Sequence, residues 1–515
     1  MKIADKTHSA VSMVKDALEK AKKYEDYHVF TFINEENALR KAAEIDEKIK
    51  KGEKVGRLAG VPYALKDNFL SPDGPTTASS KILEPFVSPI TATAVKKLEA
   101  EGAIMIGRTN MDSFAHGSST ENSYFGPTKN AVDKDRVAGG SSGGSAVAVA
   151  LNIVPFATGT DTGGSIRQPA SFNGVYGFKP TYGTISRYGV VAMASSTDCI
   201  GFFARSASDI DLLMQICAGQ DPNDLTTLPD YYGCATDKER INISNSDRSE
   251  LASVSKEEST KELALSDRRR SAEPKAMKER AVPVKTGDGD ACRSANVNPL
   301  RIGVISDFDN DDVDKDIRSA LADKIALLKS KGHEIIELDM PTLKYALAVY
   351  YILVPAEISS NLSRHDGIRY GHRSDKAKSL DDVFGLSRSE GFMPENKRRI
   401  MIGNFVLSSG FYDAYYLKAQ KARTLIIEEY NKAFEKCDFI LTPVAPNPAF
   451  KFGEKTGDPV KMYLEDVMSV PLNLAGLPGL AIPAGENKNG LPLGLQLVGP
   501  RRSDAALLKF AEELS

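Results

Sequence analysis

Apolar and polar positions follow two periods along the chain and predict a sheet flanked by helices. Residues 9–27 and 34–52 place apolar side chains three and four positions apart among charges, which predicts two amphipathic helices. Residues 58–66 and 103–109 are short apolar runs typical of buried strands, and residues 91–102 between them have a helical period. This succession of helices and strands predicts an α/β fold.

The same alternation returns in the second half of the chain. We see no internal repeat and no linker that divides two cores, so these segments extend one large unit. The segments predict helices over 207–219, 313–332 and, as one long stretch, 404–437, and strands over 300–308, 333–340, 438–444, 479–485 and 490–499.

Residues 233–298 interrupt the pattern. They contain no aromatic residue and are dominated by Ser, Lys, Glu, Asp and Arg. Such a segment cannot bury enough apolar surface to offset the entropy lost on ordering. We therefore predict one domain made of residues 1–232 and 299–515, with a disordered insertion over 233–298.

Composition and charge narrow the class of protein. The chain has 515 residues, 41% of them hydrophobic and 26% charged, and a net charge of −3, so bulk electrostatics do not select nucleic acid or an anionic membrane. Its five cysteines lack close pairs, which argues against a disulfide framework and a zinc site. The N-terminal residues lack the apolar core of a secretory signal, and there is no run of 18 apolar residues. We expect a cytoplasmic protein with reduced thiols, no membrane span and no bound metal.

Two glycine–serine clusters, at residues 139–145 and 163–165, surround one apolar segment. Three interpretations compete. The phosphate-binding patterns G-x-x-x-x-G-K-[ST] and G-x-G-x-x-G are both absent. A pair of structural turns is the second interpretation. The third is a nucleophile site, which needs an exposed hydroxyl, a base and backbone N–H groups aimed at a developing oxyanion.

The nucleophile interpretation assigns roles to the segment 162–165. Ser165 would carry the hydroxyl, and the backbone of Thr162, Gly163 and Gly164 would form the oxyanion hole. The chain has six histidines, and only His116 is near in sequence, without an obvious carboxylate to orient it. Lys66, at the end of a buried strand, is the other candidate base, because desolvation favours its neutral amine. It could accept a proton directly or through Ser141.

These motifs resemble the amidase signature family. The resemblance joins GVPYALKDNF, GRTNMDSFAHGSSTENSYFGPTKN, AGGSSGGSAVAVA and GTDTGGSIRQPASFNGVYGFKPTYG within about residues 55–205, and keeps the family spacing of 75 residues from Lys66 to Ser141 and 24 to Ser165. It implies a single domain with a central mixed β-sheet and helices on both faces. It also implies a Ser-Ser-Lys triad: Ser165 as nucleophile, Ser141 as bridge after a cis Gly140–Ser141 bond, and Lys66 as base. Ser142 would be a supporting neighbour.

Later segments, including KRRIMIGNFVLSSGFYDAYYLKAQKARTLI and MYLEDVMSVPLNLAGLPGLAIP, resemble one branch of that family, the A subunits of glutamyl-tRNA(Gln)/aspartyl-tRNA(Asn) amidotransferases. The resemblance implies hydrolysis of glutamine, with Arg399 on its α-carboxylate, Asp466 on its α-amino group and Tyr350 lining the pocket. The departures from the family pattern are the insertion and the histidines His116 and His365, where relatives carry apolar side chains.

The same resemblance implies partners rather than cofactors of this chain. The ammonia would pass to B and C subunits of a heterotrimer. ATP and magnesium would be used by the partner subunit, which would also hold the mischarged tRNA. Two alternatives stay open: a free-standing amidase that needs no charged pair such as Arg399 and Asp466, and a catalytically silent scaffold subunit.

Overall fold

The computed structural model describes residues 9–229, 232, 299–308 and 310–514. The segment 233–298 lies outside the described residues, so its predicted disorder and the domain limits drawn around it stay predictions. One 11-stranded sheet, in the order β1-β3-β2-β4-β6-β5-β10-β11-β9-β7-β8, forms the centre. The strands are β1 (Phe30–Ile33), β2 (Pro62–Lys66), β3 (Ile104–Thr109), β4 (Phe156–Asp161), β5 (Tyr176–Lys179), β6 (Cys199–Ala204), β7 (Arg301–Ile305), β8 (Glu334–Leu338), β9 (Phe439–Pro443), β10 (Gly479–Glu486) and β11 (Pro492–Val498).

The sheet is mixed, as the resemblance implies. β2 pairs in parallel with β3 and β4, and β7 pairs in parallel with β8 and β9, whereas the pairs from β4 through β6, β5, β10 and β11 to β9 are antiparallel. Parallel neighbours end at the same edge of a sheet. The last residue of β2 therefore lies close to the residues that follow β4, and this edge carries the candidate site.

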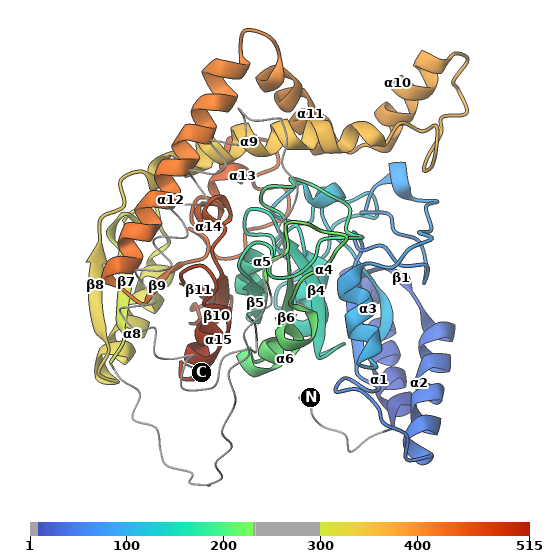
Figure 1. Ribbon diagram of the computed structural model, residues 1–515, viewed down its shortest axis with the longest axis horizontal. Coiled ribbons are helices and arrows are strands. Elements are labelled where there is room, and N and C mark those ends of the chain that lie inside the picture. The colour runs from blue at the N-terminus through green and yellow to red at the C-terminus, as the bar shows by residue number, and fades with distance from the viewer. Residues whose placement is uncertain (1–8, 230–231, 233–298, 309, 515) are drawn as a thin grey trace, which may run out of the picture.

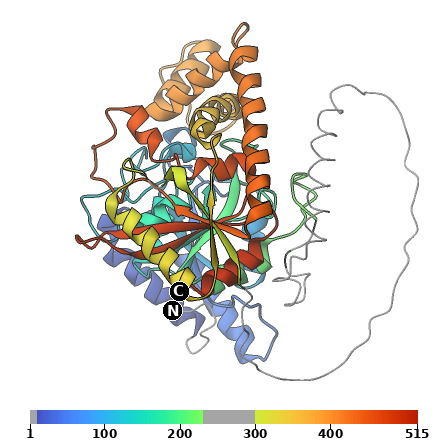
Figure 2. The same ribbon diagram turned by 90° about the vertical axis from the view of Figure 1, so that its left-hand side faces the viewer.

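Helices cover both faces of the sheet (Figures 1 and 2). Side chains alternate between the faces: Tyr63 and Leu65 of β2 join one apolar cluster, and Ala64 between them joins another. The helices are α1 (Ala10–Lys23), α2 (Glu35–Lys50), α3 (Thr93–Ala100), α4 (Gly143–Ala150), α5 (Arg167–Asn173), α6 (Ala207–Cys217), α8 (Lys315–Ser330), α9 (Ala346–Asn361), α10 (Leu380–Gly391), α11 (Pro394–Leu407), α12 (Lys418–Lys436), α13 (Pro459–Leu464), α14 (Val470–Ala475) and α15 (Asp504–Glu512). α1, α2, α4 and α5 supply the second cluster, and α3, α6, α8 and α15 supply the first.

The helices α9, α10 and α11 lie beyond one end of the sheet, and α12 runs from there down beside it (Figure 1). The prediction of one helical stretch over 404–437 was wrong in its continuity. α11 ends at Leu407, Gly410 takes a left-handed φ of 87°, and a π-helical segment, Tyr412–Leu417, leads into α12. Glycine adopts this conformation without steric cost, which a count of apolar spacings does not register.

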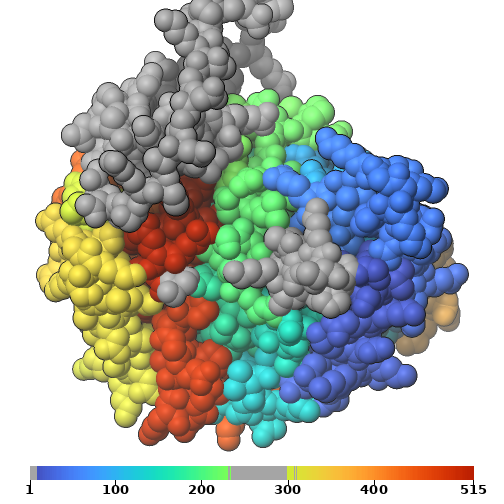
Figure 3. Space-filling model, turned by 90° about the horizontal axis from the view of Figure 1, so that it is seen from below, coloured from blue at the N-terminus to red at the C-terminus, as the bar shows by residue number. Residues whose placement is uncertain are grey.

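The two halves of the sequence occupy opposite sides of the sheet, with strands β1 to β6 on one side and β7 to β11 on the other. Seen from below, the N-terminal residues (blue) and residues after 300 (yellow) are at opposite sides, with green and red segments between them (Figure 3). None of the described helices combines the length and the apolar character that a membrane span needs.

Candidate active site

Lys66 ends β2 and is fully buried. Its Nζ lies 2.9 Å from Ser141 Oγ, 2.7 Å from Ser142 Oγ and 2.7 Å from Thr160 Oγ1. Thr160 reaches this point because β4 runs parallel to β2. The structure therefore brings the predicted base into contact with the predicted bridging serine and its neighbour.

Burial lowers the pKa of Lys66 to about 7, although Asp112, Asp161 and Asp198 favour its charged form. The hydroxyl of Ser142 donates to the carbonyl of Thr160 at 3.2 Å, so its oxygen accepts from Lys66. A neutral amine has two N–H donors and one lone pair. Ser141 can thus donate its proton to the lone pair while Ser142 and Thr160 accept from the two N–H groups.

Ser141 lies before α4, after a cis peptide bond from Gly140, as the resemblance implies. Space requires glycine at position 140, because an added Cβ would lie 2.1 Å from Asp112 Oδ2. The backbone N–H of Asp112 donates to the carbonyl of Ser141 at 3.2 Å. The loop around Asp112 therefore packs directly against the bridging serine.

Ser165 lies in the turn between β4 and α5, with 8% of its surface exposed. Ser142 N–H donates to its carbonyl at 3.2 Å, which places the two serine loops in contact. Among the described residues no hydrogen bond joins the hydroxyl of Ser165 to that of Ser141. Such bonds are often long in unliganded enzymes and tighten when substrate binds.

The N–H donors of the predicted oxyanion hole differ from the prediction at one position, with Ser165 in place of Gly164. Gly164 has a φ of 128°, and its N–H donates to Asp161 Oδ1 at 2.8 Å, so it shapes the loop. In the described part of the chain, the N–H groups of Thr162, Gly163 and Ser165 have no acceptor. These three are the donors available to a ligand.

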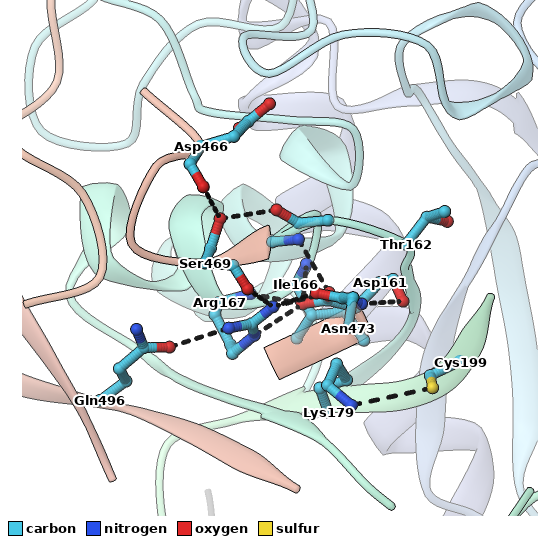
Figure 4. A network of polar contacts seen from close by, with 12 residues as sticks. Asp161, Thr162, Ile166, Arg167, Lys179, Cys199, Asp466, Ser469, Asn473 and Gln496 are labelled. Carbon is cyan, nitrogen blue, oxygen red and sulfur yellow. Dashed lines mark hydrogen bonds and ion pairs between the residues drawn. The ribbon is translucent and has the colours of Figure 1, made fainter. Parts of the chain in front are cut away.

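Two of the three predicted substrate-binding residues, Tyr350 and Asp466, lie close to this loop. A Cβ on Gly163 would come within 2.5 Å of the Tyr350 hydroxyl, so that tyrosine of α9 packs on the loop. The Ser469 hydroxyl donates to the carbonyl of Gly163 at 2.6 Å, and the backbone N–H of Ser469 donates to the backbone carbonyl of Asp466. Figure 4 shows Ser469 next to Asp466. Ser469 thus connects Asp466, the residue expected to bind the α-amino group, to the nucleophile loop.

Arg399 and Asp466 are both buried and share an aromatic neighbour. The guanidinium lies 5.3 Å from the centre of the Tyr351 ring, and the Tyr351 hydroxyl donates to Asp466 Oδ2 at 2.9 Å. Burial raises the pKa of Asp466 to about 7 against the hydrogen bonds from Tyr351 and Ser118. An arriving ammonium group would favour its ionised form.

Sequence reasoning missed the residues that hold this pair. Ser118 donates to Asp466 at 2.9 Å. Tyr463 stacks on Tyr351 at 3.9 Å and donates to Glu395 Oε1 at 2.9 Å, and the same oxygen accepts from Arg399 Nε at 2.8 Å. The spacing of Glu395 and Arg399 on one helix face is the only local signal that could have indicated part of this network.

The competing base, His116, is fully buried and makes no hydrogen bond to the nucleophile in the described part of the chain. Its Nδ1 lies 2.7 Å from Asn396 Nδ2. The described residues also hold no group of three or more His, Cys, Asp or Glu side chains that could bind a metal ion. A cavity lined by Asn68, Thr160 and Thr162, among others, borders the Lys66 network.

A mixed sheet that gathers a buried lysine and three serines at one edge is suited to acyl transfer through a serine, the class of reaction that includes amide hydrolysis. The family model described as Amidase matches residues 12–282 and 260–508, and the chain belongs to the amidase family.

Similar relatives within this family share one name. The A subunit of glutamyl-tRNA(Gln) amidotransferase from Carboxydothermus hydrogenoformans is 44% identical over 515 residues, covering 99% of this chain and 94% of the relative. The protein of that name from Thermosynechococcus vestitus is 44% identical, covering 94% of this chain and 89% of its own. The crystal structure of the A subunit of glutamyl-tRNA(Gln) amidotransferase from Thermotoga maritima superposes with a TM-score of 0.71 at 34% identity, over 97% of this chain and 90% of that one.

Proposed function

We propose that this chain is the glutaminase subunit of a tRNA-dependent amidotransferase. It hydrolyses the side-chain amide of glutamine and supplies ammonia for the transamidation of Glu-tRNA(Gln), Asp-tRNA(Asn) or both. The names of the relatives support the assembly. The observation that carries the choice of substrate is the buried pair Arg399 and Asp466, a cation over the ring of Tyr351 and an anion that accepts from its hydroxyl. An amino acid offers a carboxylate and an ammonium to such a pair.

The acylation step uses the lysine and two serines. Ser165 Oγ attacks the amide carbon and passes its proton to Ser141, whose own proton moves to the neutral amine of Lys66. The proton then returns along the same hydroxyl to the amide nitrogen, the C–N bond breaks, and ammonia leaves. The product is a glutamyl ester on Ser165. Support for this route comes from the 2.9 Å contact of Lys66 Nζ with Ser141 Oγ.

The hydrolysis step repeats the proton path with water. Water gives a proton through Ser141 to Lys66 and attacks the ester, and Ser165 recovers its proton as glutamate leaves. In both steps the N–H groups of Thr162, Gly163 and Ser165 stabilise the oxyanion. Each such donor contributes about 3 kcal/mol to the lowering of the barrier in comparable sites.

The proposal assigns the remaining chemistry to partner subunits. B and C subunits complete a heterotrimer in the cytoplasm, and the partner that holds the mischarged tRNA uses ATP and magnesium to activate it. This chain contributes ammonia and carries no cofactor of its own.

Glutamine hydrolysis by the purified chain, alone and with the B and C subunits, tests the proposal. We expect Ser165→Ala to lower kcat by about 10⁴-fold or more. Ser171→Ala, which alters a buried serine of α5 outside the site, is the matched control and should keep the activity. Equal glutamate release by wild type and Ser165→Ala would identify a silent scaffold. Unchanged turnover in Arg399→Ala would identify a free-standing amidase.

A further inference from the structure

His116 has a ring nitrogen without an acceptor. The imidazole is fully buried, and its Nε2 has no hydrogen-bond partner among the described residues. Leaving a buried donor unpaired costs free energy, and native proteins seldom tolerate it without a functional reason. The position of this nitrogen therefore calls for an explanation.

The surroundings fix which nitrogen carries the proton. Asn396 Oδ1 accepts from the backbone N–H of Met393 at 3.0 Å, and its Nδ2 donates to the carbonyl of Ser113 at 2.8 Å. These two backbone groups set the orientation of the amide. Its Nδ2 must then also donate to His116 Nδ1 at 2.7 Å. Because burial and the charge of Arg399 hold the pKa of His116 well below its usual value, the ring is neutral and its proton is on Nε2.

A second set of donors is close by. Asn396, which contacts His116, and Arg399 are three residues apart on one face of α11, and the charge of Arg399 adds to burial in lowering the pKa of His116, so the guanidinium lies near the imidazole. Within the described residues the only hydrogen bond of Arg399 is from Nε to Glu395, which leaves its two terminal nitrogens available. Two residues after His116, Ser118 bonds Asp466. The segment 116–118 thus contacts the helix that carries the cation at one end and the anion of the proposed substrate site at the other.

A neutral imidazole N–H beside a guanidinium fork presents donors that only an electron-rich ligand can satisfy. A carboxylate offers about four lone-pair sites, enough for the fork and one further donor. We propose that His116 is a third substrate-binding residue, whose Nε2–H donates to the α-carboxylate of glutamine beside Arg399. This inference rests on the proposed function and deepens it. It makes His116 a determinant of specificity for amides that carry a carboxylate.

Equilibrium binding to the full-length Ser165→Ala chain, measured by titration calorimetry, tests the assignment apart from turnover. Three ligands separate the contacts: glutamine, glutaramate (which lacks the ammonium) and 4-aminobutanamide (which lacks the carboxylate). We expect His116→Met to weaken binding of glutamine and glutaramate about tenfold, the range for a hydrogen bond to a charged group. Binding of 4-aminobutanamide should change less than about twofold.

His365→Met is the matched control, because His365 is also a buried histidine with an unpaired nitrogen but lies among Phe114, Tyr370 and Phe392. It should leave all three affinities unchanged. His116→Gln, which keeps an N–H, should retain most of the affinity and serves if the methionine variant does not fold. Equal losses for all three ligands, or no loss for any, would overturn the assignment of His116. Failure of glutamine to bind the Ser165→Ala chain at all would instead reject the proposed function.

Discussion

At the scale of single residues, the chemistry depends on the protonation state of Lys66. Its three hydroxyl neighbours are the same for the amine and the ammonium, but only the amine has a lone pair for the Ser141 proton. A lysine with the usual pKa of about 10.4 would be almost fully charged at neutral pH. Burial without an adjacent carboxylate in hydrogen-bond contact is what makes the neutral form accessible.

We therefore predict that activity rises with pH through the pKa of Lys66, about 7, and levels off above it. The sign follows because the base must be deprotonated. With glutaramate as substrate, kcat/KM should fall about tenfold per pH unit below the transition, since it reports the free enzyme. With glutamine the fall should be steeper, because Asp466, with its pKa also about 7, must ionise to hold the ammonium. A kcat/KM that stays constant from pH 5 to 9 would contradict a lysine base. The Asp466→Asn variant should lose only the additional steepness that glutamine shows relative to glutaramate.

The tyrosine pair offers a second test at this scale. The Tyr463 hydroxyl reaches Arg399 through Glu395, and the Tyr463 ring centre lies 5.6 Å from the Arg399 guanidinium, so Tyr463 is a positioning residue for the carboxylate site. We expect Tyr463→Phe to raise KM for glutamine about threefold to tenfold with little change in kcat, the effect of one lost hydrogen bond. KM for 4-aminobutanamide should stay the same. The control is Tyr416→Phe, at a tyrosine that accepts from Gln420 on α12. A fall in kcat of Tyr463→Phe for every substrate would instead argue that Tyr463 has a structural role.

At the scale of elements, Arg167 ties four of them together beneath the nucleophile loop (Figure 4). Located at the start of α5, it forms a two-point ion pair with Asp161 at the end of β4, donates to Asn473 of α14 at 2.6 Å and to Gln496 of β11 at 2.9 Å. Burial opposes the ionisation of Asp161, but Arg167, helped by Lys179 and Asn473, holds its pKa well below the usual range. The carboxylate then orders the loop by accepting from the N–H of Gly164 and Ile166.

Arg167→Met should therefore destabilise the protein by about 3–5 kcal/mol, because it leaves the buried charge of Asp161 without its partner. It should also abolish activity by loosening the loop. Denaturant unfolding measures the first effect, and glutamine hydrolysis at low temperature measures the second. As the control, Lys134→Met, which breaks the solvent-exposed ion pair with Asp26, should leave the denaturant concentration at the unfolding midpoint almost unchanged. Similar midpoints for Arg167→Met and wild type would refute the role of this network.

The same scale shows what the sequence could predict. β2 and β3 were predicted because strands buried on both faces are unbroken apolar runs. Lys66 was proposed because it ends a buried strand, and Ser141 was proposed as its hydroxyl bridge; the resemblance added the family spacing. The bond between Tyr463 and Glu395 spans 68 positions and the contact of Asn396 with His116 spans 280, so no local period encodes either. Such contacts exist only once the loops and α11 have packed together.

At the scale of the whole molecule, the two parts of the chain on either side of 233–298 share one sheet. Strands β1 to β6 precede this segment and β7 to β11 follow it, and the two groups meet where β5 pairs with β10. Further links cross this boundary. Arg167 bonds Gln496, the Thr181 hydroxyl bonds Asp504 at 2.6 Å, and α6 packs with α15 in one apolar cluster. Neither half can bury its edge strand without the other.

This arrangement predicts how the protein responds to a cut. The segment 233–298 includes the run DRRR at residues 267–270, and its composition predicts that trypsin cleaves there first. The two fragments should nevertheless co-elute in size-exclusion chromatography and keep glutaminase activity within about twofold, since the described bonds that join the two parts of the sheet do not involve this segment. They should separate only in denaturant, which serves as the control. Fragments that part under native conditions would show that continuity of the chain, rather than the β5–β10 pairing and its neighbouring bonds, holds the sheet together.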